Sequence, residues 1–394
     1  MSRILFVLNT YPGQGGVETV TTNLIRGFGQ YCAEHSVYVL AYDKVPGMEL
    51  PGNVRKTFYF TEKSRSRISE ANVALYNKII ADYGITHVIN QGMYPFLTNI
   101  VLNDSMNPDV KVISCLHAMP SYLEEDYWST RAANSIKKLT LRLLCHLGLN
   151  FSYNRFMKKY IAGYRRAAEK GTKVVLLCND YIEEFCSLYN IPEKFRNKIC
   201  AIPNPLSPEY SERMADKVLD NKENILLYVG RLSYEKNPSL IVDAWKLLQD
   251  RMPDWKFLIV GDGPLRTEIE HKISRENIRR IKMEGFTQTP SEYYRKAKIL
   301  ILASKYEGFT MVLLEAQRFG VIPVAYPCSA GVGSIISDGG GIGIESLSAS
   351  SIASAVCQAA SSDLKMRDLA ESALAKSRNW ELPAIVSRWM NLLS

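Results

Sequence analysis

The sequence predicts an α/β protein with two doubly wound, parallel-sheet domains of similar size. Short apolar, β-branched runs alternate with amphipathic stretches of helical length along the chain, which is the pattern of βαβ units in a parallel sheet. The alternation stops at three prolines within residues 203–208 and a polar stretch at 211–224, and then starts again. We therefore expect domains at 1–205 and 206–379 and a C-terminal helix at 380–394.

Each element of the first domain follows from this alternation. The β-branched runs predict strands at 3–8, 36–42, 86–90, 110–116 and 173–178. The amphipathic stretches between and after them predict helices at 17–30, 67–83, 130–147 and 155–170.

The second domain repeats the scheme. Strands are predicted at 225–229, 257–260, 278–284, 299–302 and 322–325, and helices at 238–250, 264–274, 291–297 and 310–319. The glycine run at 339–343 is interpreted as a loop. Doubly wound sheets bind ligands beyond the carboxyl ends of their strands, so the loops that follow the strands are the places to search for a site.

Composition narrows the class of protein. The 394 residues are 46% hydrophobic and 22% charged, which excludes a disordered or fibrous chain. No run of 18 apolar residues predicts a transmembrane helix, and the apolar N-terminus is interpreted as a buried strand instead of a signal peptide. Eight cysteines without CxxC spacing indicate buried thiols in a reducing cytoplasm, and the net charge of +8 favours an anionic partner.

The first candidate site is the glycine-rich loop at 13–18, which follows the first predicted strand. Glycines such as Gly16 let backbone amides approach a ligand, and the following helix offers its positive N-terminus to an anion. A dinucleotide site is an alternative, with Asp43 as the ribose-binding acid, although the loop lacks the GxGxxG spacing. A turn without a ligand is the other alternative.

Two loops of the second domain are further candidates. Arg231 and Lys236 lie five residues apart after the strand at 225–229, where both cations could contact one polyanion such as a diphosphate. Their alternative interpretation is as solvated surface cations. The loop at 261–265 is interpreted mainly as a structural turn into a helix that begins with proline.

The segment 304–316 is the most informative, because it holds two glutamates on either side of a helix start. Glu307 lies in the loop before the helix. Glu315 lies inside the helix, about 7 Å further along at a rise of about 1.5 Å per residue. The amides between them form an anion site, which would place Glu315 near the ribose of a nucleotide and Glu307 near a transferred group. The alternative is an amphipathic helix with two exposed glutamates. These amides lie around 309–312, and the donor-binding residues expected in this segment are Gly308, Phe309, Thr310 and Met311.

These motifs together resemble the retaining glycosyltransferases of family 4, over nearly the whole chain. The resemblance implies the GT-B architecture, with two Rossmann-like domains facing across a cleft and the C-terminal helix crossing back to the first domain. It implies that Arg231 and Lys236 bind the donor diphosphate, that Glu315 holds the ribose and that Glu307 contacts the donor sugar. Phe286 lies in the segment expected beside the base. The loop at Gly16 is expected beside the phosphate and acceptor.

The resemblance also implies a mechanism. His117, which follows the strand at 110–116, matches a histidine near the anomeric carbon. No protein nucleophile is implied, and the leaving phosphate accepts the proton of the acceptor. We therefore expect a metal-independent, retaining hexosyltransferase with no cofactor, which uses a UDP- or GDP-sugar donor and a glycan or lipid-linked acceptor. It would work in the cytoplasm in surface-polysaccharide synthesis, and no nucleic acid partner is expected.

Three positions depart from the family pattern, and two other functions remain open. Thr19 replaces an arginine, Asn204-Pro205 replaces Asn-Gly, and 331–336 replaces a Gly-Pro-x-Glu-Ile-Ile segment. These departures concern contacts to sugar or acceptor. A non-catalytic protein that binds nucleotide sugars and a GT-B epimerase are the alternatives to a transferase.

The stretch 131–170 predicts a membrane-binding surface. It holds ten basic residues and one acidic residue, for a net charge of +9. Leucines and aromatic residues alternate with these cations at helical spacing, as in helices that lie on anionic membranes. We expect peripheral contact at the inner face of the cell membrane, and the alternative is a solvated helical face.

Overall fold

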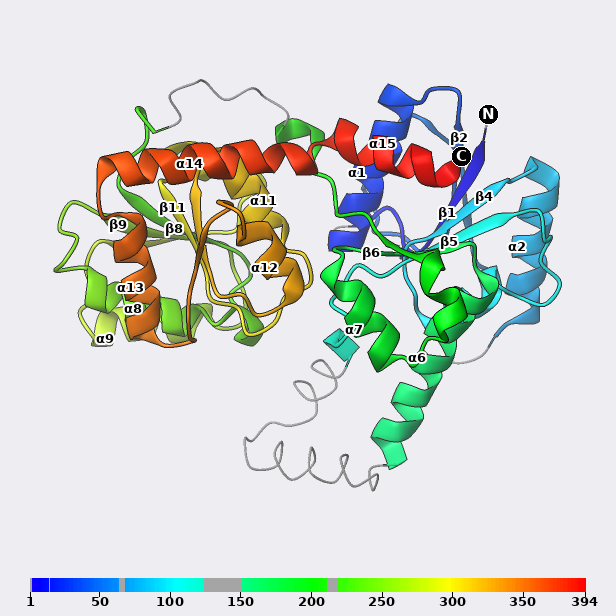
Figure 1. The fold of residues 1–394 in the computed structure, drawn as a ribbon, viewed down its shortest axis with the longest axis horizontal. Coiled ribbons are helices and arrows are strands. Elements are labelled where there is room, and N and C mark those ends of the chain that lie inside the picture. The colour runs from blue at the N-terminus through cyan, green and yellow to red at the C-terminus, as the bar shows by residue number, and fades with distance from the viewer. Residues whose placement is uncertain (1, 14, 64–67, 124–150, 211–218) are drawn as a thin grey trace. The chain divides into compact units, whose positions relative to one another are not determined.

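The chain folds into two compact units, each with its own parallel sheet (Figure 1). A computed structural model describes residues 2–13, 15–63, 68–123, 151–210 and 219–394. Contacts between Cα atoms group Met1–Pro205 with Ile385–Ser394, and they group Leu206–Ala384 as the second unit. The helix predicted at 130–147 lies outside the described residues.

The first unit contains a seven-stranded sheet of order β3-β2-β1-β4-β5-β6-β7, with every pairing parallel. Its strands are β1 (Arg3–Thr10), β2 (Ser36–Asp43), β3 (Val54–Tyr59), β4 (His87–Asn90), β5 (Lys111–Cys115), β6 (Lys173–Leu176) and β7 (Ile199–Ala201). The five predicted strands are confirmed. The two edge strands were not predicted, because β3 includes Arg55 and Lys56 and β7 has only three residues.

Helices cover this sheet and carry its core-facing apolar side chains. In α1, the buried residues Val20, Leu24 and Phe28 recur at helical spacing. Ser69 caps α2 by accepting a hydrogen bond from the amide of Asn72. The helices of the first unit are α1 (Gly16–Tyr31), α2 (Glu70–Tyr83), α3 (Pro95–Val101), α6 (Phe151–Lys170), α7 (Asp180–Leu188) and, in its greater part, α15 (Leu382–Leu393).

The second unit contains a six-stranded parallel sheet of order β10-β9-β8-β11-β12-β13. Its strands are β8 (Ile225–Val229), β9 (Lys256–Val260), β10 (Ile281–Gly285), β11 (Ile299–Leu302), β12 (Ile322–Ala325) and β13 (Ile342–Gly343). Its helices are α8 (Pro238–Leu248), α9 (Arg266–Arg275), α10 (Ser291–Lys296), α11 (Met311–Arg318), α12 (Ala330–Ile336), α13 (Ala349–Ala359) and α14 (Asp363–Ser377). The predicted strands and helices up to residue 325 are confirmed.

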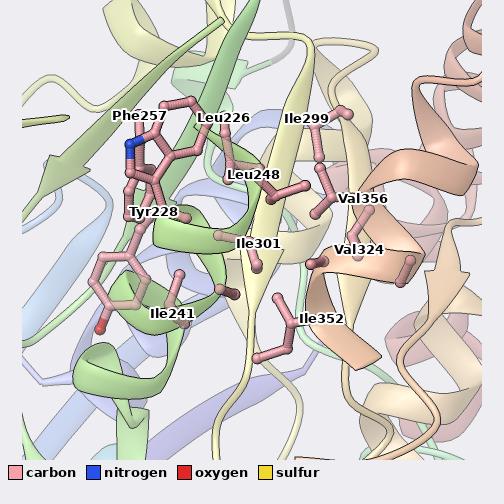
Figure 2. Close-up of a cluster of buried hydrophobic side chains, with 14 of the residues drawn as sticks. Leu226, Tyr228, Ile241, Leu248, Phe257, Ile299, Ile301, Val324, Ile352 and Val356 are labelled. Atoms are coloured by element: carbon pink, nitrogen blue, oxygen red, sulfur yellow. The ribbon is translucent and has the colours of Figure 1, made fainter. Parts of the chain in front are cut away.

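The core of the second unit lies between its sheet and two helices, as Figure 2 shows. Ile241 and Leu248 of α8 and Ile352 and Val356 of α13 are buried against the strands. The strand side chains that meet them are Leu226, Phe257, Ile299, Ile301 and Val324. This packing fixes the strands whose carboxyl ends carry the candidate site.

The prediction of a loop across the glycine run was wrong in part. Ile342 and Gly343 form β13, which pairs with Val324 and Ala325 of β12. A Cβ atom at Gly341 would lie 2.6 Å from the carbonyl oxygen of Pro323, so the approach to β12 requires glycine there. The neighbouring strand supplies the pairing that local propensity does not.

The strand order of each sheet reverses at one point, and this determines which loops are neighbours. In the second unit the reversal lies between β8 and β11, so the loops after these strands start side by side. In the first unit it lies between β1 and β4. Ligands of doubly wound sheets bind at such switch points, outside the carboxyl ends of the strands.

Candidate active site

In the second unit, the loops after β8 and β11 meet through an ion pair. Lys236 Nζ lies 2.5 Å from Glu307 Oε1, and the two side chains are 24% and 10% exposed. The hydroxyl of Ser304 donates to the same carboxylate oxygen at 2.7 Å. The amide of Lys305 donates to the carbonyl of Glu235 at 2.8 Å, which ties the two loops along their backbones. Two predicted site residues, 71 positions apart, are therefore in direct contact.

Arg231 lies on the same loop as Lys236 but remains exposed. Among the described residues, no acceptor lies within hydrogen-bonding distance of its guanidinium group. The hydroxyl of Tyr228 donates to the carbonyl of Arg231 at 2.8 Å and so holds the backbone beneath it. A cation held in this way is available to an anionic ligand.

The turn at 261–265 supports the Arg231 loop by close backbone packing. Gly261 has φ +135°, and a Cβ atom there would collide with the carbonyl oxygen of Gly230. A Cβ atom at Gly263 would lie 2.5 Å from the carbonyl oxygen of Leu232. The two glycines are needed for this approach, which agrees with their interpretation as a structural turn.

Phe286 stands at the end of β10, next to the same turn. The amide of Gly261 donates to the carbonyl of Gly285 at 2.7 Å, and Gly285 has φ +81°. Phe286 itself is 75% exposed. An exposed aromatic ring at the carboxyl edge of the sheet offers a flat apolar surface to a ligand.

The start of α11 carries amides that no side chain caps within the described part of the chain. Thr310 is the N-cap residue and makes no side-chain cap, and the first turn has no acidic residue. Phe309 packs edge-to-face on Trp380 with ring centroids 5.4 Å apart, and the carbonyl of Gly308 accepts a hydrogen bond from Ser329. Met311 is half-buried at the first helical position. The helix start is therefore fixed and carries positive partial charge.

Glu315 lies one turn further along α11, where its carboxylate is held by a buried phenol. The hydroxyl of Tyr294 donates to Glu315 Oε2 at 2.9 Å. Burial, opposed by the hydrogen bond from Tyr294 and assisted by the charge of Glu209, raises the pKa of Glu315 to about 7. The protonation state of Glu315 therefore changes near neutral pH.

Cys328 is a site residue that the sequence analysis did not identify. Burial, followed by the negative charge of Glu307, raises the pKa of its thiol to about 12. The side chain is thus a neutral thiol beside the Lys236–Glu307 pair. Its position after the strand at 322–325 is the signal that could have indicated it.

In the first unit, His117 is held between two side-chain amides. Its Nδ1 lies 3.1 Å from Asn204 Oδ1, and its Nε2 contacts the side-chain oxygen of Gln91. Burial lowers the pKa of His117 to about 4, so the ring is neutral at physiological pH. A neutral ring has one N–H group, so one of the two amides must present its NH₂ group to the ring. Gln91 was not predicted, although it directly follows the strand at 86–90.

A cavity of about 230 Å³ opens beside this histidine within the first unit. Val17 of α1 lines it, as do Gln91 and His117. Its aromatic lining consists of Tyr94, Tyr122, Tyr160 and Tyr164. The preceding residue, Gly16, is exposed, and a Cβ atom there would have no neighbour within 4 Å. Packing within the unit therefore does not require a glycine at position 16. The glycine-rich loop lies near His117, because Val17, which follows Gly16, lines the same cavity.

The basic stretch 131–170 lies only in part within the described residues. Its six described cations belong to α6. Three of them contact acceptors inside the unit: Arg165, Arg166 and Lys170. The other three are exposed: Arg155, Lys158 and Lys159. The aromatic side chains of α6 pack along the helix towards the buried Tyr164.

Across the residues that the structure describes, no group of three or more His, Cys, Asp or Glu side chains is placed to hold a metal ion. The helices described between residues 16 and 393 include none with both the length and the apolar character needed to cross a bilayer.

Two parallel α/β units, each with a doubly wound sheet, are the architecture of the GT-B class of glycosyltransferases, and this chain has that fold. The family descriptions "Glycosyltransferase Family 4" and "Glycosyl transferases group 1" match residues 14–210 and 210–376. The chain belongs to glycosyltransferase family 4, and the predicted family and fold are confirmed.

Relatives in sequence support the family assignment, and solved structures support the fold. The chain is 28% identical to the amylovoran biosynthesis glycosyltransferase AmsD of Erwinia amylovora over 64% of this chain and 70% of that one. It is 27% identical to an α-1,4-N-acetyl-D-galactosaminyltransferase of Campylobacter jejuni over 51% of this chain and 56% of that one. Anabaena HepE in complex with UDP has a similar fold, with a TM-score of 0.75, 16% identity and coverage of 100% and 99% of the two chains. The structure of Staphylococcus aureus TarM also has a similar fold, with a TM-score of 0.72, 13% identity and full coverage of both chains.

Proposed function

We propose that this protein is a retaining glycosyltransferase that moves a sugar from a UDP- or GDP-sugar to a glycan or lipid-linked glycan in surface-polysaccharide synthesis. The observation that carries the proposal is the Lys236–Glu307 pair, whose glutamate lies on the loop that leads to the uncapped start of α11. A cation, a carboxylate and the backbone amides of a helix start suit a ligand that joins a diphosphate to a polar sugar.

Each described group has a role in this proposal. Arg231, Lys236 and the amides at the start of α11 neutralise the diphosphate as it leaves. Glu315 accepts hydrogen bonds from the ribose hydroxyls, and Phe286 lies beside the base. Glu307 contacts the transferred sugar.

In the proposed reaction, one bond to the anomeric carbon breaks and another forms. The bond from this carbon to the diphosphate oxygen breaks, and the electron pair leaves with the diphosphate. The acceptor hydroxyl forms the new bond on the same face and gives its proton to the departing diphosphate oxygen. No side chain becomes covalently attached. On the acceptor side, neutral His117 and the loop at Gly16 border the aromatic cavity, which suits the apolar face of a sugar.

The printed names of relatives support the acceptor class. AmsD is named for amylovoran biosynthesis, and the Campylobacter enzyme is named for transfer to a PP-undecaprenol-linked glycan. HepE has been solved with UDP and with UDP-glucose. We extend a UDP-sugar donor and a lipid-linked glycan acceptor to this chain on that basis.

The test is a donor-turnover assay with UDP- and GDP-sugars, with and without lipid-linked glycan acceptors. A transferase releases nucleoside diphosphate and extends the acceptor with retained configuration, and this activity survives EDTA because the protein's own cations neutralise the diphosphate. Isomerised donor without acceptor would indicate an epimerase, and donor binding without turnover would indicate a binding protein. Activity lost in EDTA and restored by magnesium would contradict the metal-independent mechanism.

We also expect electrostatic contact with an anionic membrane through α6. Changing Arg155, Lys158 and Lys159 together to glutamate should abolish salt-sensitive co-sedimentation with anionic vesicles, since each cation contributes about 1 kcal/mol near such a surface. A matched triple change in the second unit, at the exposed Arg275, Lys282 and Lys296, is the control and should leave binding intact. Equal sedimentation with neutral vesicles, or none with either kind, would refute this contact.

A further inference from the structure

The carboxylate of Glu315 depends on a tyrosine from a different helix. Tyr294 of α10 is completely buried, and its hydroxyl is 2.9 Å from Glu315 Oε2. Its ring stacks on Phe319 with centroids 5.8 Å apart, and Tyr210 packs edge-to-face on Phe319 at the same distance. The phenol therefore has a fixed position from which it donates one hydrogen bond.

A buried lysine in turn holds the backbone of Tyr294. Lys222 is 8% exposed, and its Nζ lies 2.5 Å from the carbonyl oxygen of Tyr294, 3.0 Å from that of Ala297 and 3.4 Å from that of Arg295. These are carbonyls that the end of a helix leaves without intrahelical partners. Three acceptors around one ammonium group match its three donors. Lys222 thus fixes the end of α10.

We propose that Tyr294 and Lys222 are positioning residues for donor binding: Lys222 fixes the end of α10, and Tyr294 orients the Glu315 carboxylate toward the ribose of a nucleoside diphosphate. The inference rests on the proposed function and deepens it. A carboxylate that binds two neighbouring hydroxyls must keep one orientation, and a donor at one oxygen leaves the other oxygen for the ligand. Neither residue touches the ligand in this scheme.

The other charged and titratable groups around Glu315 oppose its ionisation or are already engaged. Glu209, next to Tyr210 in the turn at Pro208–Tyr210, repels the carboxylate and raises its pKa. Arg318 of α11 donates to the carbonyl of Tyr210 at 2.8 Å and lies 3.1 Å from Glu381. The hydrogen bond from Tyr294 acts in the other direction and lowers the pKa of Glu315.

The sign of the pH dependence follows from these contacts. Only the carboxylate form of Glu315 accepts two ribose hydroxyls, and its pKa is about 7. Affinity for a nucleoside diphosphate should therefore rise with pH through neutrality, by up to about tenfold per pH unit below the midpoint. Loss of the Tyr294 hydroxyl should move this midpoint to higher pH.

The first test measures UDP and GDP binding by calorimetry from about pH 6 to 9 for the whole chain, Y294F, Y293F and E315A. We expect Y294F to weaken binding about 3- to 10-fold at pH 7 and to raise the pH midpoint. Y293F is the matched control on the same helix and should bind the nucleotides as the unchanged protein does. E315A should bind them weakly, and its affinity should show no midpoint in this pH range. A Y294F variant with unchanged affinity and midpoint would overturn the inference.

The second test compares K222M with K296M, which removes an exposed lysine from α10, the helix whose end Lys222 contacts. K222M should weaken UDP binding several-fold below pH 7. Burial lowers the pKa of Lys222 to about 7, so the difference from the unchanged protein should shrink above that pH. A pH-independent loss of UDP affinity that parallels a loss of thermal stability would assign Lys222 a structural role alone. It would overturn the proposed role of Lys222 in donor binding. If the unchanged protein bound neither nucleotide, the proposed function would fall, and this inference with it.

Discussion

Replacing Lys236 with alanine is expected to lower kcat by about 100-fold or more. The ammonium group lies 2.5 Å from Glu307 Oε1 on the loop after β8, where it can neutralise a diphosphate. Its removal takes away a positive charge that acts on the leaving group, which develops negative charge only as the bond breaks. Because the interaction strengthens in the transition state, turnover should fall more than donor affinity.

The same substitution has a second consequence that a control can separate. The Glu307 side chain is 10% exposed in the intact pair, and among the described residues Ser304 is its remaining hydrogen-bond donor once Lys236 is lost, so the free energy of unfolding should fall by about 1–3 kcal/mol. Lys256 is a matched control, because it also lies 2.5 Å from a glutamate, Glu223, but the two side chains are 47% and 50% exposed. Lys256→Ala should change neither kcat nor thermal stability measurably. Near-normal turnover in Lys236→Ala would remove Lys236 from the proposed catalytic site.

The sequence identifies the site loops because they follow strongly apolar strands. Arg231 and Lys236 come directly after β8, and Glu307 comes shortly after β11. The parallel topology then places all three at one edge of the sheet. The contact between Lys236 and Glu307 could not be predicted in the same way, because it depends on β8 and β11 being neighbours across the switch point.

Residues that act through tertiary contacts leave no signal in the sequence. Tyr294 reads as one more aromatic residue of an amphipathic helix, and Lys222 lies in a polar stretch interpreted as a linker. Their roles depend on contacts with residues 21 and 72 positions away. Gln91 could be predicted only in part. Its place after a strand is visible in the sequence, but its contact with His117 is not. Burial, which the histidine alone does not indicate, explains its neutral state.

Elements were missed where packing overrides local propensity. The helices α13 and α14 begin at Ser348 and Ser362, which cap them through the amides of Ser351 and Lys365. These caps are visible in the sequence, but both helices are rich in serine and alanine, and the apolar periodicity of α14 is weak. Their burial against the sheet, shown for α13 in Figure 2, supplies the stability.

Glu307→Gln is expected to lower kcat by about 100-fold while it changes the donor Kd only a few-fold. Glutamine keeps the volume and can still accept a hydrogen bond from Ser304, so the loop should remain in place. The lost negative charge is the one proposed to lie beside the reacting sugar, where positive charge develops. Glu223→Gln, which neutralises the exposed partner of Lys256, is the control and should leave turnover unchanged.

Combining Lys236→Ala with Glu307→Gln tests whether the two residues act as one unit. Independent contributions would multiply to a loss of about 10⁴-fold, whereas residues in direct contact are usually non-additive. We expect the double variant to lose little more turnover than the worse single variant, since each change already disrupts the pair. Its thermal stability should exceed that of Lys236→Ala, because no unpaired carboxylate remains. Fully multiplicative losses, with stability no better than in Lys236→Ala, would show that the 2.5 Å contact between Lys236 and Glu307 is not part of a functional unit.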